Sequence, residues 1–141
     1  MIEVARVLLE DILRQGRVRY PGGACGVLLG TPGDPDAAAD PTVVEASRPG
    51  RPEADSCAGP SAEDVEAAGR EGATRGLAVV GTWHTHPDAA AEPSPADLAG
   101  GGPGRVELIV SVRKGQAAEW ACWTEEAGLS GLRPVIVKLT G

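Results

Sequence analysis

The segment from Leu77 to Thr82 constrains the fold more than any other feature of this sequence. Its residues, LAVVGT, are apolar or β-branched apart from one glycine. That composition is typical of a strand buried inside a sheet. The run leads directly into the sequence WHTHP, which contains His84 and His86, the two histidines of the chain. We therefore predict a central strand that carries both imidazoles at its end.

The rest of the pattern predicts a single α/β domain over residues 1–141. Apolar residues spaced three and four apart predict an amphipathic helix over 2–15, closed by Gly16. A second helix is predicted over 62–74, with Ser61 as its N-cap and Asp64 at capping-box distance. The order of elements favours a mixed β-sheet flanked by helices. Further strands are predicted at 24–29, 43–47, 106–112, 117–124 and 135–139.

Composition limits the core and the partners. The 141 residues include no Phe and only 3% aromatic residues, so the core must be mostly aliphatic. A net charge of −7 argues against nucleic acid or an anionic membrane as a partner. No apolar run reaches the roughly 18 residues of a membrane-spanning helix. Three cysteines without CxxC spacing argue against a disulfide framework and favour a reducing, cytoplasmic compartment.

The histidine pair suggests a metal site. In an extended strand, residues two apart point to the same face, so His84 and His86 would present both imidazoles together. Two neutral imidazoles and a third protein ligand suit zinc and leave one coordination position for water. The alternative is that one histidine packs in the core and the other is solvated.

A candidate third ligand follows downstream. Ser94 and Asp97 stand three apart at the start of a short predicted helix over 95–99. The Asp97 carboxylate could complete a His₂Asp zinc site. The same spacing also describes an ordinary helix N-terminus, in which Ser94 caps and Asp97 favours the helix dipole.

Together, His84-Thr85-His86-Pro87 and Ser94-Pro95-Ala96-Asp97 resemble the signature of the JAMM (JAB1/MPN) metalloprotease family. The resemblance covers nearly the whole chain and is similar to the small bacterial members. It implies a JAMM/MPN-like fold, related to that of cytidine deaminases.

The resemblance also implies an activity. Zinc would be held by His84, His86 and Asp97, and Ser94 would help to hold the oxyanion. The reaction would be hydrolysis of an amide or isopeptide bond after the glycine-rich tail of a ubiquitin-like or sulfur-carrier protein, or of a peptide.

The chain departs from the family at the general base. In the family a Glu stands two residues after the proline of P-x-E-x-C-G, and here that position is Gly23. Glycine cannot move a proton, so activity is in question. Glu45, Glu92 and Asp88 are candidate substitutes, although a surface carboxylate is normally only solvated. The glycine-rich stretch 100–104 also predicts that Asp97 lies on a short turn.

Three functional hypotheses remain open from the sequence. The first is a JAMM-type zinc hydrolase. The second is a zinc-binding pseudoenzyme that recognises a ubiquitin-like protein or serves as an assembly subunit. The third is a structural domain without a site. Cys25 lies in an apolar run and is expected to be a small buried hydrophobe, not a nucleophile. No role is assigned to Trp120 and Trp123, of which at least one is expected to be exposed.

Overall fold

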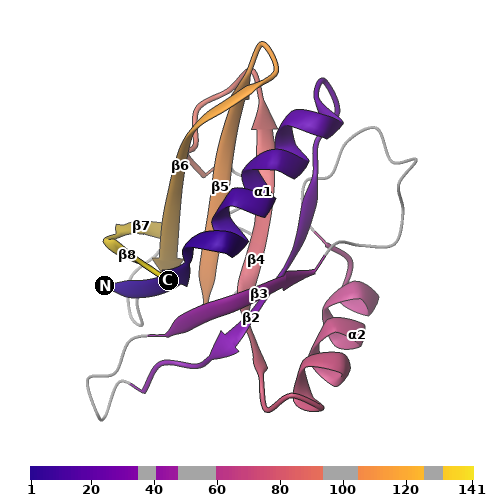
Figure 1. Cartoon of the computed structure of the whole chain (residues 1–141), viewed down its shortest axis with the longest axis vertical. Coiled ribbons are helices and arrows are strands. Elements are labelled where there is room, and N and C mark those ends of the chain that lie inside the picture. Colours follow the sequence, from indigo (N-terminus) through magenta and orange to yellow (C-terminus); the bar gives the residue numbers. More distant parts are fainter. Residues whose placement is uncertain (35–40, 48–59, 94–104, 126–131) are drawn as a thin grey trace.

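One mixed sheet organises the molecule (Figure 1). The computed structural model describes residues 1–34, 41–47, 60–93, 105–125 and 132–141. Within these residues the strand order is β7-β6-β5-β4-β2-β3-β1-β8. The strands at the two ends of that order are separated in the chain by Ile136 alone, so the sheet curls round and nearly closes. The strands are β1 (Ile2–Ala5), β2 (Cys25–Thr31), β3 (Thr42–Ser47), β4 (Ala78–Pro87), β5 (Val106–Arg113), β6 (Gln116–Glu125), β7 (Leu132–Val135) and β8 (Val137–Thr140).

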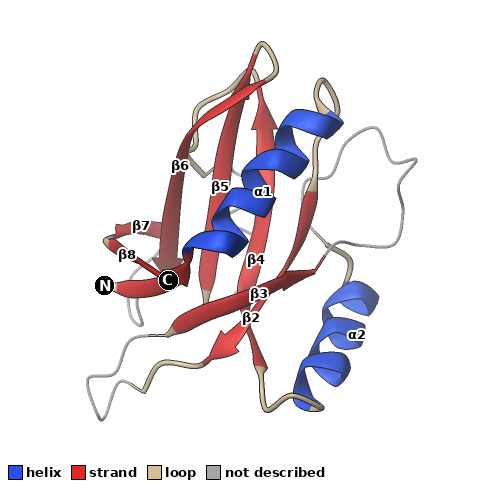
Figure 2. Ribbon diagram, viewed as in Figure 1, coloured by secondary structure: helices blue, strands red, loops and turns tan. Residues whose placement is uncertain are grey.

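Two helices cover opposite faces of the sheet (Figure 2). Helix α1 (Arg6–Arg19) packs against β1, β3, β5 and β6, and α2 (Ala62–Ala73) packs against β2 and β4. Neighbouring residues of β2 show the two faces. Leu28 belongs to the larger apolar cluster with α1, whereas Leu29 belongs to the smaller cluster beneath α2. Because side chains alternate along a strand, the helices lie on different sides.

The core is aliphatic, as the composition predicts. Trp83 is the one fully buried aromatic side chain among the described residues, and it lies within the α1 cluster. The other large buried members of that cluster are Leu, Ile and Val, including Ile12, Leu28 and Leu108. The predicted single-domain α/β fold with a mixed sheet and flanking helices is confirmed.

The N-terminal prediction is partly wrong. Residues 2–5, predicted as helical, form β1, and Ile2 and Val4 are buried between the parallel neighbours β3 and β8. The helix also continues past Gly16 to Arg19. A Cβ at Gly16 would lie 3.0 Å from Val112 Cγ2 and 3.1 Å from Thr85 Cγ2. The glycine therefore permits close approach of helix to sheet and does not end the helix.

Helix α2 is confirmed together with its ends. The Ser61 hydroxyl accepts from the Asp64 amide, and the Asp64 carboxylate accepts from the Ser61 amide, so the capping box is complete. The helix is closed by Gly76 in the left-handed region, at φ 74°, and by a hydrogen bond from the Leu77 amide to the Gly72 carbonyl. This is the arrangement that a C-terminal glycine favours.

Most strand predictions are confirmed, with two differences. Strand β4 continues to Pro87 and so includes both histidines. The predicted strand at 135–139 is two strands, β7 and β8, divided at Ile136. The helical turn predicted at 95–99 lies outside the described residues. No helix in the described ranges is long and apolar enough to cross a membrane.

Candidate metal centre

The two histidines lie on the sheet face opposite α1. Along β4, Trp83 is fully buried in the α1 cluster, and the Thr85 methyl lies close to Gly16 of α1. His84 and His86 alternate with these residues and therefore point to the other face. The predicted shared face required the strand to stay extended through both histidines, and β4 does so.

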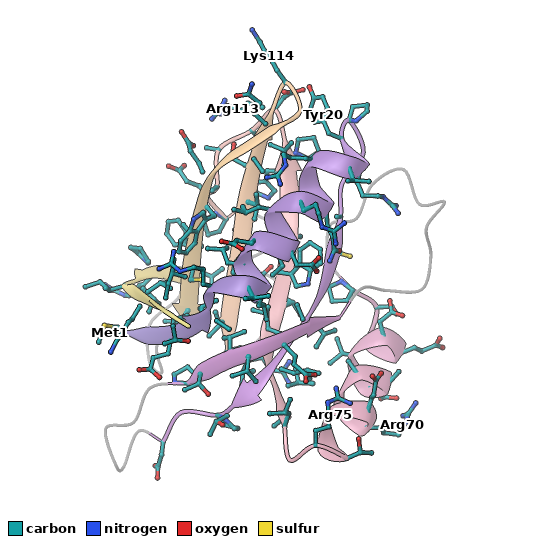
Figure 3. All side chains as sticks on the ribbon, in the orientation of Figure 1. Met1, Tyr20, Arg70, Arg75, Arg113 and Lys114 are labelled. Carbon is teal, nitrogen blue, oxygen red and sulfur yellow. The ribbon has the colours of Figure 1, made fainter. Side chains whose placement is uncertain are left out.

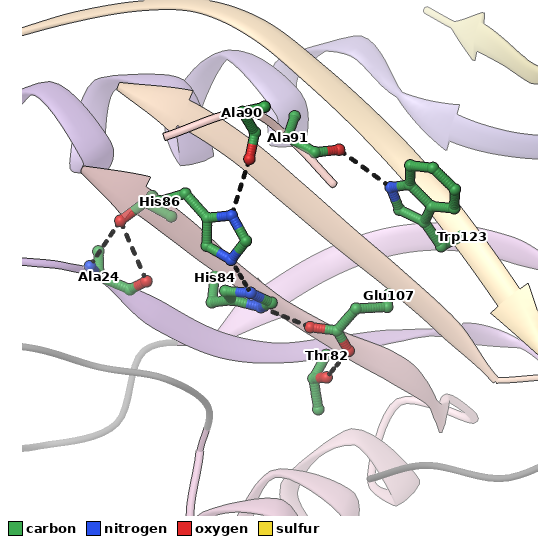
Figure 4. A network of polar contacts seen from close by, with 9 residues as sticks. Ala24, Thr82, His84, His86, Ala90, Ala91, Glu107 and Trp123 are labelled. Carbon is green, nitrogen blue, oxygen red and sulfur yellow. Dashed lines mark hydrogen bonds and ion pairs between the residues drawn. The ribbon is translucent and has the colours of Figure 1, made fainter. Parts of the chain in front are cut away.

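The two imidazoles converge (Figure 4). Their Nε2 atoms are 2.9 Å apart, and the ring centroids are 4.8 Å apart with the planes tilted by 53°. His84 is almost completely buried, at 1% exposure, while His86 is half-buried. Two nitrogens bound to one tetrahedral zinc at about 2.0–2.1 Å lie about 3.3 Å apart, so a small opening of the pair would suit the ion.

Each imidazole is held from behind by an acceptor. His84 Nδ1 lies 2.6 Å from Glu107 Oε1, and His86 Nδ1 lies 2.8 Å from the Ala90 carbonyl oxygen. A carbonyl and an ionised carboxylate only accept. In neutral rings both Nδ1 atoms therefore carry the hydrogen, and both Nε2 atoms present a lone pair.

With this tautomer, the pair fits a cation. Two lone pairs that face each other at 2.9 Å repel unless a positive charge is shared between them. A metal ion supplies that charge directly, and histidines that bind metals are commonly held through the other ring nitrogen in this way. The donor set at His84 and His86 therefore matches the chemistry of a zinc site.

Glu107 is a site residue that the sequence reasoning missed. It lies opposite Thr82 in the parallel ladder between β4 and β5, and the Thr82 hydroxyl donates to its other carboxylate oxygen. The available signal was its position, because it is the one acidic residue in the apolar run 106–112. Nothing in that run, however, indicates which strand lies alongside.

The turn after β4 holds the partner of His86. Three consecutive carbonyls each receive a side-chain donor. The Ser111 hydroxyl donates to Ala89 at 2.6 Å, His86 to Ala90, and the Trp123 indole N–H to Ala91 at 3.1 Å. Figure 4 draws the His86–Ala90 and Trp123–Ala91 contacts. Together the three contacts fix the backbone beside the imidazole.

The expectation for the two tryptophans is therefore wrong. Trp120 and Trp123 are both half-buried, so neither is exposed. Trp120 packs against the main apolar cluster. Trp123 donates to Ala91 in the turn that orients His86, a contact between β6 and the loop after β4 that only the tertiary structure creates.

Gly23 lies beside the histidine pair. In the antiparallel ladder Cys25 is opposite His84, and the Thr85 amide donates to the Ala24 carbonyl at 2.9 Å. Continuing that register places Gly23 next to His86, on the same face of the sheet. Gly23 is buried. Gly23 therefore lies next to the strand that carries the histidines, and it has no side chain.

The cysteines differ from expectation. Cys25 is disulfide-bonded, so the expectation of reduced cysteines without a disulfide is wrong at this residue. Cys122 is free and buried, and burial, with a smaller contribution from the Glu107 charge, raises its pKa to about 12. Cys122 therefore behaves as a small hydrophobe.

Ser94 and Asp97 lie outside the described residues. Within the ranges that the structure does describe, no three His, Cys, Asp or Glu side chains are grouped so as to hold a metal. The predicted third ligand and oxyanion donor remain predictions. The described chain supplies two of the three proposed ligands and the groups that orient them.

The candidate substitute bases are not brought to the histidine pair. Glu45 Oε2 forms an ion pair at 2.6 Å with Arg75 Nη2, near the C-terminal end of α2. Glu92 is exposed on the loop after β4. The Asp88 carboxylate accepts from the Tyr20 hydroxyl at 2.7 Å and from the Lys114 amide at 3.0 Å.

The Asp88 contacts join three turns at one end of the molecule, where Figure 3 shows Tyr20 and Lys114 together. The Lys114 amide, and then the Tyr20 hydroxyl, hold the Asp88 pKa below 3.8. The hydrogen bond between Tyr20 and Asp88 also raises the pKa of Tyr20 above 10.0. A carboxyl group whose pKa is lower in the folded than in the unfolded chain stabilises the fold when the pH is above its unfolded pKa. That stabilisation is lost as the pH falls through its folded pKa.

We expect Asp88→Asn to lower the melting temperature near neutral pH, because one charged acceptor for two donors is removed. Asn tolerates the left-handed conformation of this residue, at φ 54°. The difference from the original chain should shrink at acid pH, as the pH falls through the lowered pKa of Asp88 and the folded carboxylate becomes protonated. It should also shrink at alkaline pH, as the pH rises through the raised pKa of Tyr20 and its hydroxyl ionises. Melting curves across pH, with Glu92→Gln as the control, measure this; a constant difference at all pH values would contradict it.

The comparison with known families decides the assignment. The model for prokaryotic homologs of the JAB domain matches residues 5–125. The chain belongs to this prokaryotic JAB family. The matched part of the JAB domain includes both helices and strands β2 to β6, and so includes the histidine pair. No curated protein sequence matches the chain significantly.

Solved structures share the fold of this JAB domain. The solution structure of DSY2949 from Desulfitobacterium hafniense has a TM-score of 0.78 at 22% identity, covering 99% of this chain and 93% of that one. AF2198, a JAB1/MPN domain protein from Archaeoglobus fulgidus, has a TM-score of 0.61 at 18% identity, covering 100% and 98%. A structure described as a JAMM metalloprotease-like zinc site in the proteasome and signalosome scores 0.60 at 18% identity, covering 100% and 99%. At these identities the likeness concerns the fold.

Proposed function

We propose that this JAB domain is a zinc-dependent amide hydrolase of the JAMM type, with His84, His86 and Asp97 as the metal ligands. The observation that carries the proposal is the histidine pair. The two Nε2 atoms lie 2.9 Å apart, and both Nδ1 atoms are engaged by acceptors, so neutral rings would turn both Nε2 lone pairs toward each other. A neighbour of the same fold is described as a zinc site, which supports zinc as the ion.

The chain's own residues have separate tasks in this scheme. When bound, zinc polarises the scissile carbonyl and lowers the pKa of its water. His84 and His86 would hold the ion from one strand. Glu107 and the Ala90 carbonyl would keep the Nε2 atoms of the two histidines turned toward it. Ser94 is the proposed donor to the developing oxyanion. Gly23 offers no proton acceptor.

The proposed substrate is an amide bond after the glycine-rich C-terminal tail of a ubiquitin-like or sulfur-carrier protein, or a peptide of the same kind. A glycine tail has no side chains to obstruct its approach as an extended strand, and strand addition is a common mode of peptide recognition. The support for this substrate is the family resemblance of the His84–Asp97 region.

The second candidate function is a zinc-binding pseudoenzyme that binds such a tail, or an assembly partner, without cutting it. Gly23 favours it. The supporting observation is the pairing of Cys25 with His84, two residues beyond Gly23 in the β2–β4 ladder. A site that holds the ion and lacks the base would bind without turning over.

Zinc binding is the test common to both functions. Purified protein supplied with zinc at neutral pH is expected to contain about one ion per chain, since one tetrahedral site is proposed. His86→Ala should reduce the bound zinc to background, because one of three protein ligands is removed. Elemental analysis after gel filtration measures both.

The half-buried His86 is the more suitable residue for this test, because truncating the buried His84 also leaves a cavity. Glu119→Gln, an exposed carboxylate on β6, is the control and should keep its zinc. Metal-free original protein under these conditions would remove the basis of both functions.

A further inference from the structure

The two imidazoles are oriented by unlike partners, a carboxylate behind His84 and a neutral carbonyl behind His86. We infer that Glu107 is a positioning residue that fixes His84 as a metal ligand and supplies the negative charge that balances the bound ion. Thr82 holds Glu107 in place. This inference rests on the proposed zinc site and adds a residue to it that the sequence signature does not contain.

The geometry around Glu107 leaves its carboxylate little freedom. Oε1 lies 2.6 Å from His84 Nδ1, and Oε2 accepts from the Thr82 hydroxyl (Figure 4). Thr82 and His84 are two apart on β4, so they point to the same face. Thr82 is directly opposite Glu107 in the parallel ladder. Both carboxylate oxygens of Glu107 are therefore engaged by β4, one by His84 and the other by Thr82.

This contact selects the useful tautomer. With Nδ1–H donated to Glu107, the lone pair of His84 is on Nε2 and faces Nε2 of His86 at 2.9 Å. Imidazole orientation about its terminal torsion is otherwise broad and roughly two-fold. Without the acceptor, the ring could turn over or carry its hydrogen on Nε2. Either change removes a metal ligand.

Charge is the second contribution of Glu107. Two neutral imidazoles and one aspartate leave a zinc ion with one net positive charge. His84 is 1% exposed and the Glu107 side chain 19% exposed, so water compensates that charge poorly. A carboxylate one imidazole away restores neutrality. The Ala90 carbonyl behind His86 is a dipole and carries no charge to do so.

The test is the zinc dissociation constant of the full chain, measured by competition with a chromophoric chelator. Glu107→Gln keeps the size and an acceptor oxygen but removes the charge, and is expected to weaken zinc binding about 10–100-fold. Thr82→Val, which frees one carboxylate oxygen, should weaken it less. Glu119→Gln removes an exposed carboxylate from the neighbouring strand, opposite Ser111, and should change nothing.

Two further measurements distinguish a positioning role of Glu107 from a role in fold stability alone. Melting of the metal-free variants reports fold stability independently of zinc. Nitrogen NMR of the histidine rings in the zinc-bound protein reports whether Nδ1 of His84 carries the hydrogen. We expect Glu107→Ala, if it folds, to lose that single tautomer, and the isosteric Gln variant decides the matter if it does not fold.

The outcomes are distinguishable. If the original chain binds no zinc, the proposed function fails. If it binds zinc and folded Glu107→Gln binds equally tightly, this inference is overturned and the proposed function stands. A variant that melts earlier without metal yet keeps the original dissociation constant also overturns it. Weakened binding in a folded variant, with Glu119→Gln unchanged, supports it.

Discussion

A Gly23→Glu variant is expected to cleave a glycine-tailed substrate about 10²–10⁴-fold faster than the original chain, the usual contribution of a general acid–base group. The reason is position. The β2–β4 register, continued two residues past Cys25, brings residue 23 next to His86 on the face that carries both histidines. A carboxylate there could accept the proton of the attacking water and pass it to the leaving amine.

The assay uses the zinc-loaded full chain and a ubiquitin-like or sulfur-carrier protein extended past its terminal glycines, with the products followed by mass spectrometry. Gly23→Gln is the matched control, because it has the same size without a base and should not gain activity. Adding His86→Ala to the Glu variant should abolish the gain.

Each result of this assay selects one function. If only the Glu variant cuts, the chain as it stands is a binder. If the original chain cuts and a chelator stops it, another group supplies the base. If neither cuts this substrate or a peptide while zinc is bound, the hydrolase proposal fails. Equal rates in the Glu and Gln variants would contradict the assignment of position 23.

Gly81→Ala is expected to destabilise the fold by about 4–5 kcal/mol or more, in the range that marks a severe structural conflict. A Cβ at this position would lie 1.8 Å from the Val106 carbonyl oxygen and 2.7 Å from its carbon. Both atoms are backbone of the neighbouring strand, so no side chain can move aside. The β4–β5 ladder would have to separate at Gly81, the residue before Thr82.

Urea unfolding of the metal-free chain measures this. Total stabilities of domains are typically about 5–15 kcal/mol, so the variant should lose a large part of its free energy of unfolding and its urea midpoint should fall sharply. Gly69→Ala on α2 is the control. Its Cβ would lie 3.4 Å from Val79 Cγ2, an ordinary contact, and a helical Gly-to-Ala change favours folding by up to about 1 kcal/mol. An unchanged midpoint for Gly81→Ala would contradict the prediction.

Local patterns predicted the elements whose stabilising contacts are local. The capping box of α2 consists of two hydrogen bonds between residues three apart. The run 77–82 is buried whichever strands flank it, and the two-residue period alone places His84 and His86 on one face. These features depend on spacing within a few residues, so the amino-acid order is sufficient to find them.

Contacts between distant strands decided the rest. The segment 2–5 has a helical spacing of apolar residues, but pairing with β3 and β8 makes it a strand. Gly16 looks like a helix end, yet the approach of α1 to the sheet makes it a packing position. In both cases tertiary burial outweighs a local propensity of at most about 1 kcal/mol per residue.

The histidine pair also has features that depend on local spacing and features that depend on tertiary contacts. The sequence by itself determined that two imidazoles share a face at the end of a buried strand, because side chains alternate with a period of two. Only the tertiary structure decided which atoms they present. Strand order and register bring Glu107 and the braced Ala90 carbonyl behind the rings, so both lone pairs turn inward. Local spacing does not predict these contacts, because they depend on which strands and loops of the fold lie side by side.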